Sequence, residues 1–246
     1  MALDFKSETD VKEFLNNLGI EYRFGCYSEK NPEVCHLLGD YLEAVKKDYE
    51  KAVKVYKSNC DDYKYGKSCL KFGSYALLGK GGQKEDFKKG YEYLKKACDD
   101  GIPEGCLHEG LLLLSHSEKC GIVDDPSKGM RLLEKACDAD NAHACYYASG
   151  FHISGLKDGK NNEKKSQKND SDKYIIPKDM NQAYKYALHG CNLGNVYCCI
   201  NLSQMYSKGD GVGKNAELAE KYKKIALDMQ SEILETNKTL NFQQGL

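Results

Sequence analysis

The sequence lacks several features that would point to particular classes of protein. It has no Trp and only 4 Pro among 246 residues, and none of its apolar runs approaches the roughly 18 residues that cross a bilayer. Neither charge dominates, since 36 Lys and Arg face 37 Asp and Glu, for a net charge of -1. These absences argue against a membrane-spanning protein, and against nucleic acid or an anionic membrane as the main partner. Hydrophobic residues at 41% and charged residues at 30% are typical of a soluble protein.

The N-terminal residues also lack the marks of a targeting segment. Residues 1–8 carry acids early and have no apolar stretch, so we expect neither a secretory signal nor a mitochondrial presequence. Cysteine, in contrast, is abundant, with 12 residues. So many cysteines suggest either metal sites or an oxidising compartment.

A segment of fixed length from an aspartate to a cysteine recurs along the chain. A small residue follows the aspartate after four positions and a larger one after seven, offsets that mark one face of an α-helix capped by the aspartate. A further segment from Asn215 keeps Ala219 and Tyr222 at these offsets but has Leu227 at the cysteine position. The complete segments are Asp48 to Cys60, Asp86 to Cys98, Asp125 to Cys137 and Asp179 to Cys191.

A second helix is expected after each of these cysteines, beyond a short polar turn and opened by a second cysteine. Four positions after the second cysteine lies a small residue, and six after it lies a bulky one. This small–large complementarity is how helical hairpins stack into a superhelix. The small residues are Gly39, Gly73, Gly110, Ser149 and Ser203, and the bulky ones are Tyr41, Tyr75, Leu112, Phe151 and Met205.

The repeat predicts an all-α fold. We expect a single right-handed α-α superhelix, or solenoid, over residues 1–246, made of about five disulfide-linked hairpins and a polar capping helix. Residues 157–173 contain no apolar side chain and are interpreted as a disordered insertion between hairpins. The expected repeats span about residues 8–45, 48–80, 85–118, 125–156 and 178–210, with the cap at 214–236.

The cysteines are expected to pair within hairpins. The first lies in the last turn of one helix and the second in the first turn of the next, which brings their Cα atoms near the roughly 5.5–6 Å that a disulfide prefers. Zinc is the competing explanation, but no pair has the C-x₂₋₄-C spacing of structural zinc sites. Cys120 and Cys198 remain as free thiols. The predicted disulfides are Cys26–Cys35, Cys60–Cys69, Cys98–Cys106, Cys137–Cys145 and Cys191–Cys199.

The sequence resembles the Sel1-like repeat family, a relative of tetratricopeptide repeats. The segment 206–213, YSKGDGVG, leading into Asn215, is similar to the glycine-rich loop of that family, and 78–82, LGKGG, is a second copy. Two branches of the family carry a disulfide in each repeat: a bacterial one associated with β-lactam binding, and a mitochondrial one of cytochrome c oxidase assembly factors. The chain is more similar to the mitochondrial branch over almost its whole length, at segments such as 26–32, CYSEKNP, and 177–180, PKDM.

That resemblance implies a function and a compartment. It implies a respiratory-chain assembly factor of the mitochondrial intermembrane space, chiefly for cytochrome c oxidase (complex IV), with complex I as a further candidate. The protein would act as a disulfide-stabilised, protein-binding scaffold and not as an enzyme, with no cofactor. The implied partners are the oxidoreductase import machinery of the intermembrane space and respiratory-chain assembly intermediates.

Two alternatives stay open. One is a haem-binding thiol–disulfide factor for copper-site assembly, for which the sequence identifies no ligand pair. The other is a β-lactamase-like hydrolase, since Ser154 to Lys157 matches S-x-x-K, although no S-D-N or K-T-G accompanies it. We expect a structural or surface role for each histidine: His36, His108, His116, His143, His152 and His189.

Overall fold

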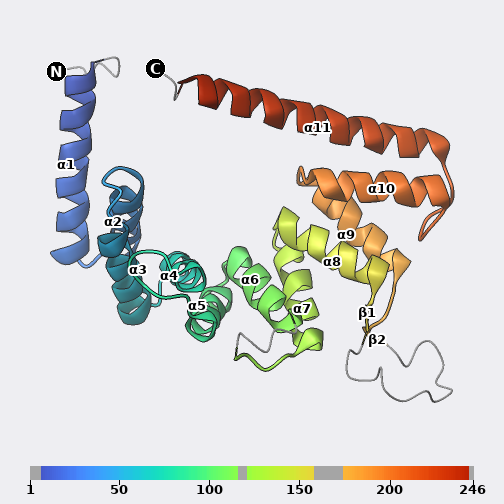
Figure 1. The fold of residues 1–246 in the computed structure, drawn as a ribbon, viewed down its shortest axis with the longest axis horizontal. Helices are drawn as coiled ribbons and strands as arrows, with labels where there is room; N and C mark the ends of the chain where they lie inside the picture. The colour runs from blue at the N-terminus through green and yellow to red at the C-terminus, as the bar shows by residue number, and fades with distance from the viewer. Residues whose placement is uncertain (1–6, 116–120, 158–173, 244–246) are drawn as a thin grey trace. The chain divides into compact units, whose positions relative to one another are not determined.

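The computed structural model describes residues 7–115, 121–157 and 174–243, with side chains as far as residue 236 (Figure 1). The chain divides into two compact units, which are described separately below. Among the residues described, no helix is both long and apolar enough to cross a membrane. Unit 1 comprises residues 1–112 and 116–123, and unit 2 comprises residues 113–115 and 124–246.

Unit 1 is a series of antiparallel helical hairpins. Each hairpin has a first helix and a second helix, and the second helix of one hairpin packs on the first helix of the next, as α2 does on α3 and α4 on α5. Its helices are α1 (Glu8–Tyr27), α2 (Pro32–Ala44), α3 (Tyr49–Tyr63), α4 (Gly66–Leu78), α5 (Phe87–Asp99) and all but the last two residues of α6 (Pro103–Leu114).

Unit 2 continues the same pattern and adds a short pair of strands. Its helices are α7 (Pro126–Asp138), α8 (Ala142–Ser154), α9 (Met180–Asn192), α10 (Val196–Lys208) and α11 (Ala216–Gln243), and its strands are β1 (Leu156–Lys157) and β2 (Tyr174–Ile176). The strands are antiparallel, with Leu156 opposite Ile176. Lys157, expected to open the insertion, therefore lies in a strand, and the rest of the predicted insertion falls outside the described residues.

The first helices of the hairpins after α1 begin where the sequence predicts, because an aspartate or asparagine caps each of them, whereas Ser7 caps α1. A carboxylate oxygen of Asp48 accepts a hydrogen bond from the Lys51 N–H at 3.0 Å. The Asn215 amide oxygen does the same for the Leu218 N–H at 2.9 Å. These side chains satisfy N–H groups that have no partner within the helix. The predicted caps are confirmed.

The glycine-rich loops fold back onto the start of their own hairpin. Gly81 and Gly211 both have a positive φ, of 73° and 72°, which favours glycine. A Cβ atom on Gly211 would collide with the Met180 carbonyl, and one on Gly81 would press against the Tyr49 carbonyl. Tyr49 and Met180 are the first residues of α3 and α9. The loop after each second helix thus closes against the first helix, which explains its glycines.

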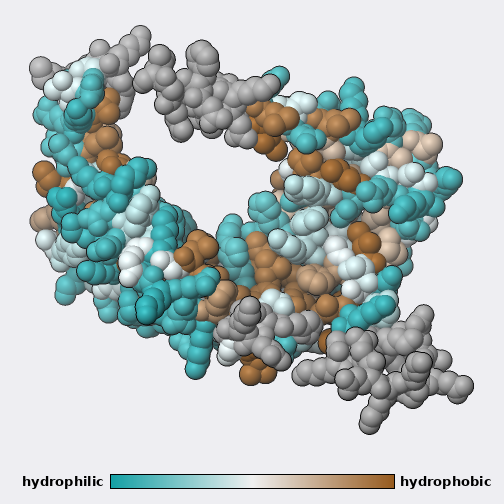
Figure 2. Space-filling model, in the orientation of Figure 1, coloured by the Kyte–Doolittle hydropathy of each residue, from teal (hydrophilic) through white to brown (hydrophobic). Residues whose placement is uncertain are grey.

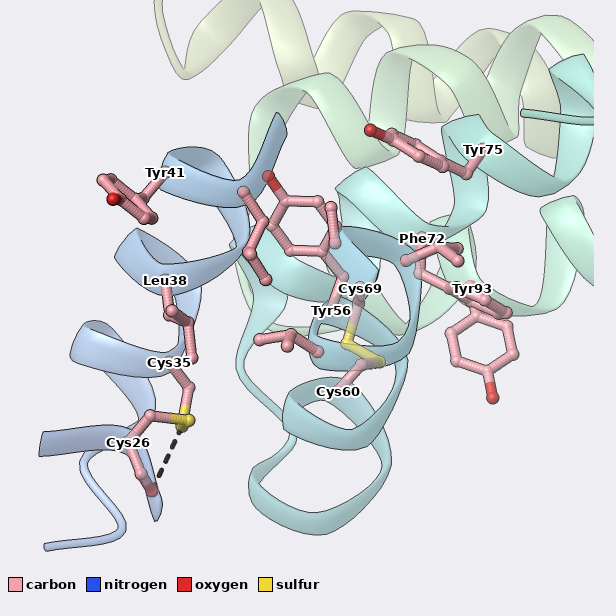
Figure 3. Packing of buried hydrophobic residues seen from close by; sticks show 14 of the residues in the cluster. Cys26, Cys35, Leu38, Tyr41, Tyr56, Cys60, Cys69, Phe72, Tyr75 and Tyr93 are labelled. Atoms are coloured by element: carbon pink, nitrogen blue, oxygen red, sulfur yellow. Dashed lines mark hydrogen bonds between the residues drawn. A yellow bond between two sulfur atoms is a disulfide. The ribbon is translucent and has the colours of Figure 1, made fainter. Parts of the chain in front are cut away.

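Aromatic rings fill glycine gaps between the helices of unit 1. Figure 3 shows two of these rings, Tyr41 and Tyr56. Gly39 of α2 lies directly against the ring of Tyr56 of α3, and Gly19 of α1 lies against Tyr41 of α2. Tyr56 is fully buried in a core that also holds the disulfide between Cys60 and Cys69. The expected pairing of a small residue with a bulky one is therefore found in this unit.

In unit 2, the small residue at this position is a serine, and its hydroxyl bonds to the backbone of the next helix. The Ser149 hydroxyl of α8 donates to the Ala183 carbonyl of α9 at 3.1 Å. One hairpin later, the Ser203 hydroxyl of α10 donates to the Ala219 carbonyl of α11 at 2.8 Å. The predicted positions are right, but here the small residue brings the two backbones close enough for a side-chain hydrogen bond.

The predicted all-α fold of disulfide-linked hairpins is confirmed. A single continuous solenoid and its repeat boundaries stay a prediction. The last helix differs most from expectation, since α11 runs to Gln243 and not to about residue 236.

Candidate functional site

Five cysteine pairs lie at disulfide distance, each joining the end of a first helix to the start of the second. Their Cα atoms are 4.5–4.8 Å apart, closer than the expected 5.5–6 Å but within the range that disulfides adopt. All ten cysteines are buried. The sulfurs are therefore shielded from solvent, which suits a structural role better than a catalytic one. The pairs are Cys26–Cys35, Cys60–Cys69, Cys98–Cys106, Cys137–Cys145 and Cys191–Cys199.

Cys198 is a free and buried cysteine on α10. Burial raises the pKa of its thiol to about 12, so the reactive thiolate is scarce at neutral pH. Its sulfur lies where a Cβ atom on Gly190 of α9 would be. The side chain therefore acts as a small apolar group at a helix contact. Cys120, the other predicted free thiol, lies outside the described residues.

His36, His152 and His189 each lie within hydrogen-bond distance of a named group. His36 Nδ1 lies 3.0 Å from the Ser68 hydroxyl, and burial lowers the pKa of this imidazole even though Asp40 opposes the shift. His152 Nε2 lies 3.1 Å from a Glu134 carboxylate oxygen. His189 is considered below. Of the others, His108 lies on α6, His143 is exposed on α8, and His116 falls outside the described residues.

His189 lies beside a disulfide. Its Nε2 is 3.1 Å from the Cys137 carbonyl oxygen, and also 3.1 Å from an Asp140 carboxylate oxygen. The sulfurs of Cys137 and Cys145 and the imidazole lie within 4.8 Å of one another. While the disulfide is intact, the two sulfurs are bonded to each other and the imidazole is the metal ligand that remains. No pattern in the sequence predicts this cluster, because its members come from different hairpins.

The S-x-x-K residues are engaged elsewhere. The Ser154 hydroxyl donates to the Gly150 carbonyl of its own helix at 3.0 Å. The Lys157 ammonium lies 5.6 Å from the centre of the Tyr174 ring. A serine nucleophile needs a base within hydrogen-bond reach, and no hydrogen bond joins these two side chains in the described structure. The arrangement does not favour the hydrolase alternative.

A groove of unit 1 lies among α1, α2 and α3, and we call it the N-terminal groove. It encloses about 670 Å³. Its floor is apolar, formed by Leu38, Leu42 and Val55, which are almost fully buried. The remaining lining residues are Arg23, Tyr27, Lys46, Asp48, Lys51, Lys54 and Ser58.

The rim of the N-terminal groove is strongly cationic. Asp48 is the one acid among the lining residues, and its carboxylate already caps α3 and pairs with Lys51 at 2.6 Å. Arg23 and Lys54 make no ion pair within the described structure and add uncompensated positive charge. An acidic segment would gain both steering and specificity from this rim.

An exposed apolar stripe on α1 lies next to the groove. Ile20, Phe24 and Tyr27 are 60%, 59% and 63% exposed, and their spacing places them on one helix face. Tyr27 also lines the groove. Figure 2 shows hydrophobic surface on α1. An apolar floor, a cationic rim and an aromatic stripe together suit an amphipathic acidic segment of another protein. The repeat pattern of the sequence alone does not locate this surface.

A charged network joins α2 to the next hairpin, formed by α3 and α4. The Glu43 carboxylate accepts hydrogen bonds from Lys71 of α4 at 3.0 Å and from Lys80 at 2.8 Å. Burial by itself would raise the pKa of Glu43, but these two ammonium groups lower it to about 2. The Tyr56 hydroxyl donates to Asp40 at 2.6 Å beside this network. These hydrogen bonds tie α2, which lines the groove, to α3 and to α4.

Comparison with protein families identifies the repeat. A family model described as the Sel1 repeat matches residues 13–57, 63–102, 112–141, 171–195 and 196–230. Among solved structures, a Sel1 repeat protein from Oxalobacter formigenes superposes with a TM-score of 0.67 and 22% sequence identity, covering 88% of this chain and 82% of that one. At this identity the likeness concerns the fold alone.

Similar proteins of full length are also found among curated proteins. The chain is 52% identical to the cytochrome c oxidase assembly factor 7 homolog of Drosophila melanogaster, over 100% of this chain and 98% of that protein. It is 36% identical to cytochrome c oxidase assembly factor 7 of Xenopus tropicalis, over 98% of this chain and 97% of that protein. The match therefore extends over both units.

Proposed function

Because the chain belongs to the cytochrome c oxidase assembly factor 7 family of Sel1-repeat proteins, we propose that it supports the assembly of cytochrome c oxidase in mitochondria. The observation that carries this proposal is the 52% identity, over the full chain, to a relative of that name. Complex I is a further proposed client.

The proposed mode of action is binding and not catalysis. Helical hairpins present extended surfaces for other proteins, and the N-terminal groove gives one such surface a definite chemistry. The exposed stripe of Ile20, Phe24 and Tyr27 beside the groove would take the hydrophobic face of a client segment. Arg23 and Lys54 would pair with acids on that segment. Holding an assembly intermediate in this way requires neither a cofactor nor a covalent step.

We propose the intermembrane space as the compartment. Disulfides persist where the environment is oxidising, and the reducing cytosol disfavours them. The five disulfides, each buried between two helices, support this assignment. The oxidoreductase that forms disulfides during import would then be a transient partner.

The proposal is tested in cells that lack this protein, by measuring cytochrome c oxidase activity and the assembled complex on native gels. Wild-type protein should restore both, whereas the double variant Arg23→Glu, Lys54→Glu should restore much less. The matched control reverses two exposed lysines outside the groove in the same unit, Lys84→Glu and Lys88→Glu, and should restore both. Complex I activity is measured in the same cells.

Normal cytochrome c oxidase in cells without the protein would contradict the proposed function. Full restoration by the groove variant would contradict the binding surface alone. Circular dichroism of the purified variants distinguishes a lost contact from a lost fold, because these exposed substitutions should leave the helix content unchanged.

A second candidate function, copper-site assembly, is favoured by the cluster around His189. If the Cys137–Cys145 disulfide were reduced, two thiolates and an imidazole would suit Cu(I). Titration of the reduced and the oxidised chain with Cu(I) tests this. Binding should occur only after reduction and should weaken with His189→Ala but not with the exposed control His143→Ala. Equal binding by both variants would contradict it.

A further inference from the structure

Helix α11 begins like the first helix of a hairpin, but within the described residues it continues as one helix and no second helix packs back on it. Asn215 caps it as Asp179 caps α9. The Ala219 carbonyl accepts a hydrogen bond from Ser203, as the Ala183 carbonyl accepts one from Ser149 in the preceding hairpin. Helix α11 therefore lies on α10 in the way that α9 lies on α8.

The sequence explains why α11 does not turn back. In the preceding hairpin, Gly194 adopts a φ of 87° and Asn195 then caps α10. The equivalent positions in α11 are Gln230 and Ser231, and the helix continues through them to Gln243. Gln230 suits a positive φ less well than Gly194 does, and the helix continues through this position instead of turning back.

The preceding hairpin shows which surface a second helix covers. Helix α10 covers a groove formed by α8 and α9. The rings of Tyr146 on α8 and Tyr197 on α10 lie 5.3 Å apart. Cys198 of α10 fits against Gly190 of α9, and Cys199 is bonded to Cys191. Small residues thus let α10 approach α9 closely, while apolar rings close the edge.

The equivalent groove on α10 and α11 is open, and we call it the C-terminal groove. It encloses about 250 Å³. Ile200 stands at the position of Tyr146, Ala226 at that of Gly190 and Leu227 at that of Cys191. Leu227 is 53% exposed, whereas Cys191 is 4% exposed beneath α10. Figure 2 shows hydrophobic surface along α11 and between α11 and α10.

We propose that the C-terminal groove binds an amphipathic α-helix of another protein, which takes the place of the missing second helix. The interface between α9 and α10 continues onto α11 and defines the occupant. A small residue on the incoming helix would face Ala226, apolar residues one turn away would cover Ile200 and Leu227, and its outer face would be polar.

The occupant comes from another protein and not from a second copy of this chain. Each second helix of the described hairpins is bonded by a disulfide to its own first helix, so a folded second copy offers none of them. Helix α11 also exposes Ile233 and Leu234, 52% and 55%, beyond the groove. A partner helix longer than one hairpin helix could cover these residues as well. This surface is distinct from the N-terminal groove, and its occupancy does not depend on the proposed role in respiratory assembly.

The test uses the chain's own second helix as a probe. A fluorescent peptide of residues 195–208, with Cys198→Ala and Cys199→Ala, is titrated with the full protein and followed by anisotropy. Saturable binding is expected for the wild type, weakened at least tenfold by Leu227→Asp and unchanged by Leu78→Asp, which alters a 74% exposed leucine in unit 1. Binding no better than that of a scrambled peptide, or equal effects of the two substitutions, would overturn the proposal.

A trapping experiment fixes the register independently of affinity. Leu227→Cys restores the cysteine of the repeat, and a peptide of residues 195–208 that keeps Cys199 but carries Cys198→Ala should form a disulfide with it. Oxidised glutathione accepts the two electrons and two protons that the thiols lose. The control Leu78→Cys should trap far less peptide. Equal trapping, or sedimentation showing that the chain self-associates through Leu227, would overturn the assignment to a partner helix.

Discussion

The two units use the same repeat but join their hairpins in different ways. In unit 1 a tyrosine ring fills the space over a glycine, as Tyr56 does over Gly39, and charged networks lie alongside. In unit 2 a serine hydroxyl bonds to a backbone carbonyl, as Ser149 does to Ala183. The repeat sets the position of a small residue, and the identity of that residue, glycine in unit 1 and serine in unit 2, decides which contact it makes.

The charged networks make the contrast stronger. Besides Glu43, unit 1 contains Asp61, which accepts hydrogen bonds from Tyr93 at 2.7 Å and Lys96 at 3.1 Å in the next hairpin. Burial would raise the pKa of Asp61, but Lys57, Tyr93 and Lys96 lower it to about 2. Unit 1 therefore depends on ionised carboxylates for part of its stability.

The largest expected effect follows the removal of a disulfide, and the loss of stability should be the same in both units. Removing Cys60–Cys69 in unit 1, or Cys191–Cys199 in unit 2, by paired Cys→Ala substitution should destabilise the unit concerned by about 2.6 kcal/mol, because both bonds close loops of nearly equal length. Amide hydrogen exchange reports the stability of each unit separately. A loss in one unit more than twice that in the other would show that strain or packing, and not loop closure, sets the effect.

The next effect should separate the units. Gly39→Ala places a methyl group on the buried Tyr56 ring, which is held by its hydrogen bond to Asp40, and should cost about 2 kcal/mol. Gly150→Ala, in the second helix α8, meets nothing within 4 Å and should instead stabilise by up to about 1 kcal/mol. Urea denaturation followed by exchange measures both. Destabilisation of similar size by both would refute the ring-over-glycine account.

Acid should weaken unit 1. The folded pKa of Glu43 and of Asp61 is about 2, below the roughly 4 of an unfolded carboxyl. The stability they add is present above about pH 4 and is lost as pH falls toward 2, by about 1 kcal/mol each after allowance for solvent screening. Glu43→Gln should flatten the acid dependence, whereas Glu8→Gln, in an exposed pair with Lys12, should not.

The smallest expected effect concerns the serine contacts. Ser149→Ala removes a buried hydrogen bond to the Ala183 carbonyl and should cost about 1 kcal/mol. Ser154→Ala, at an exposed site on the same helix, should cost almost nothing. Thermal unfolding checks both. Measurement of chromogenic β-lactam hydrolysis on the same two variants adds a test, because activity abolished by Ser154→Ala alone would revive the hydrolase alternative.

The fold follows from the sequence to the extent that it is periodic. Aspartate caps and small residues at fixed offsets give the helix starts and the contact positions, and the cysteine spacing gives the pairs. The strands β1 and β2 could not be predicted, because two or three residues carry no detectable alternation. The full length of α11 was missed because the expected end at about residue 236 rested on the repeat, and the helix continues past it.

The candidate sites were harder to predict, because they join residues far apart in the chain. Glu43 meets Lys71 and Lys80 across hairpins, and His189 reaches the disulfide of the preceding hairpin. The N-terminal groove draws on three helices whose cationic residues share no motif. One feature of these sites can be read from the sequence: Leu227 occupies the cysteine position of the repeat, and this residue lines the C-terminal groove.

The central claim is that disulfides hold these hairpins together in an oxidising compartment. It is tested most directly by the mass of the protein isolated from mitochondria under acid quench and alkylated before and after reduction. Of the 12 cysteines, ten should be protected until reduction and two should react once the chain is unfolded. Alkylation of all 12 without reduction would contradict both the disulfides and the compartment.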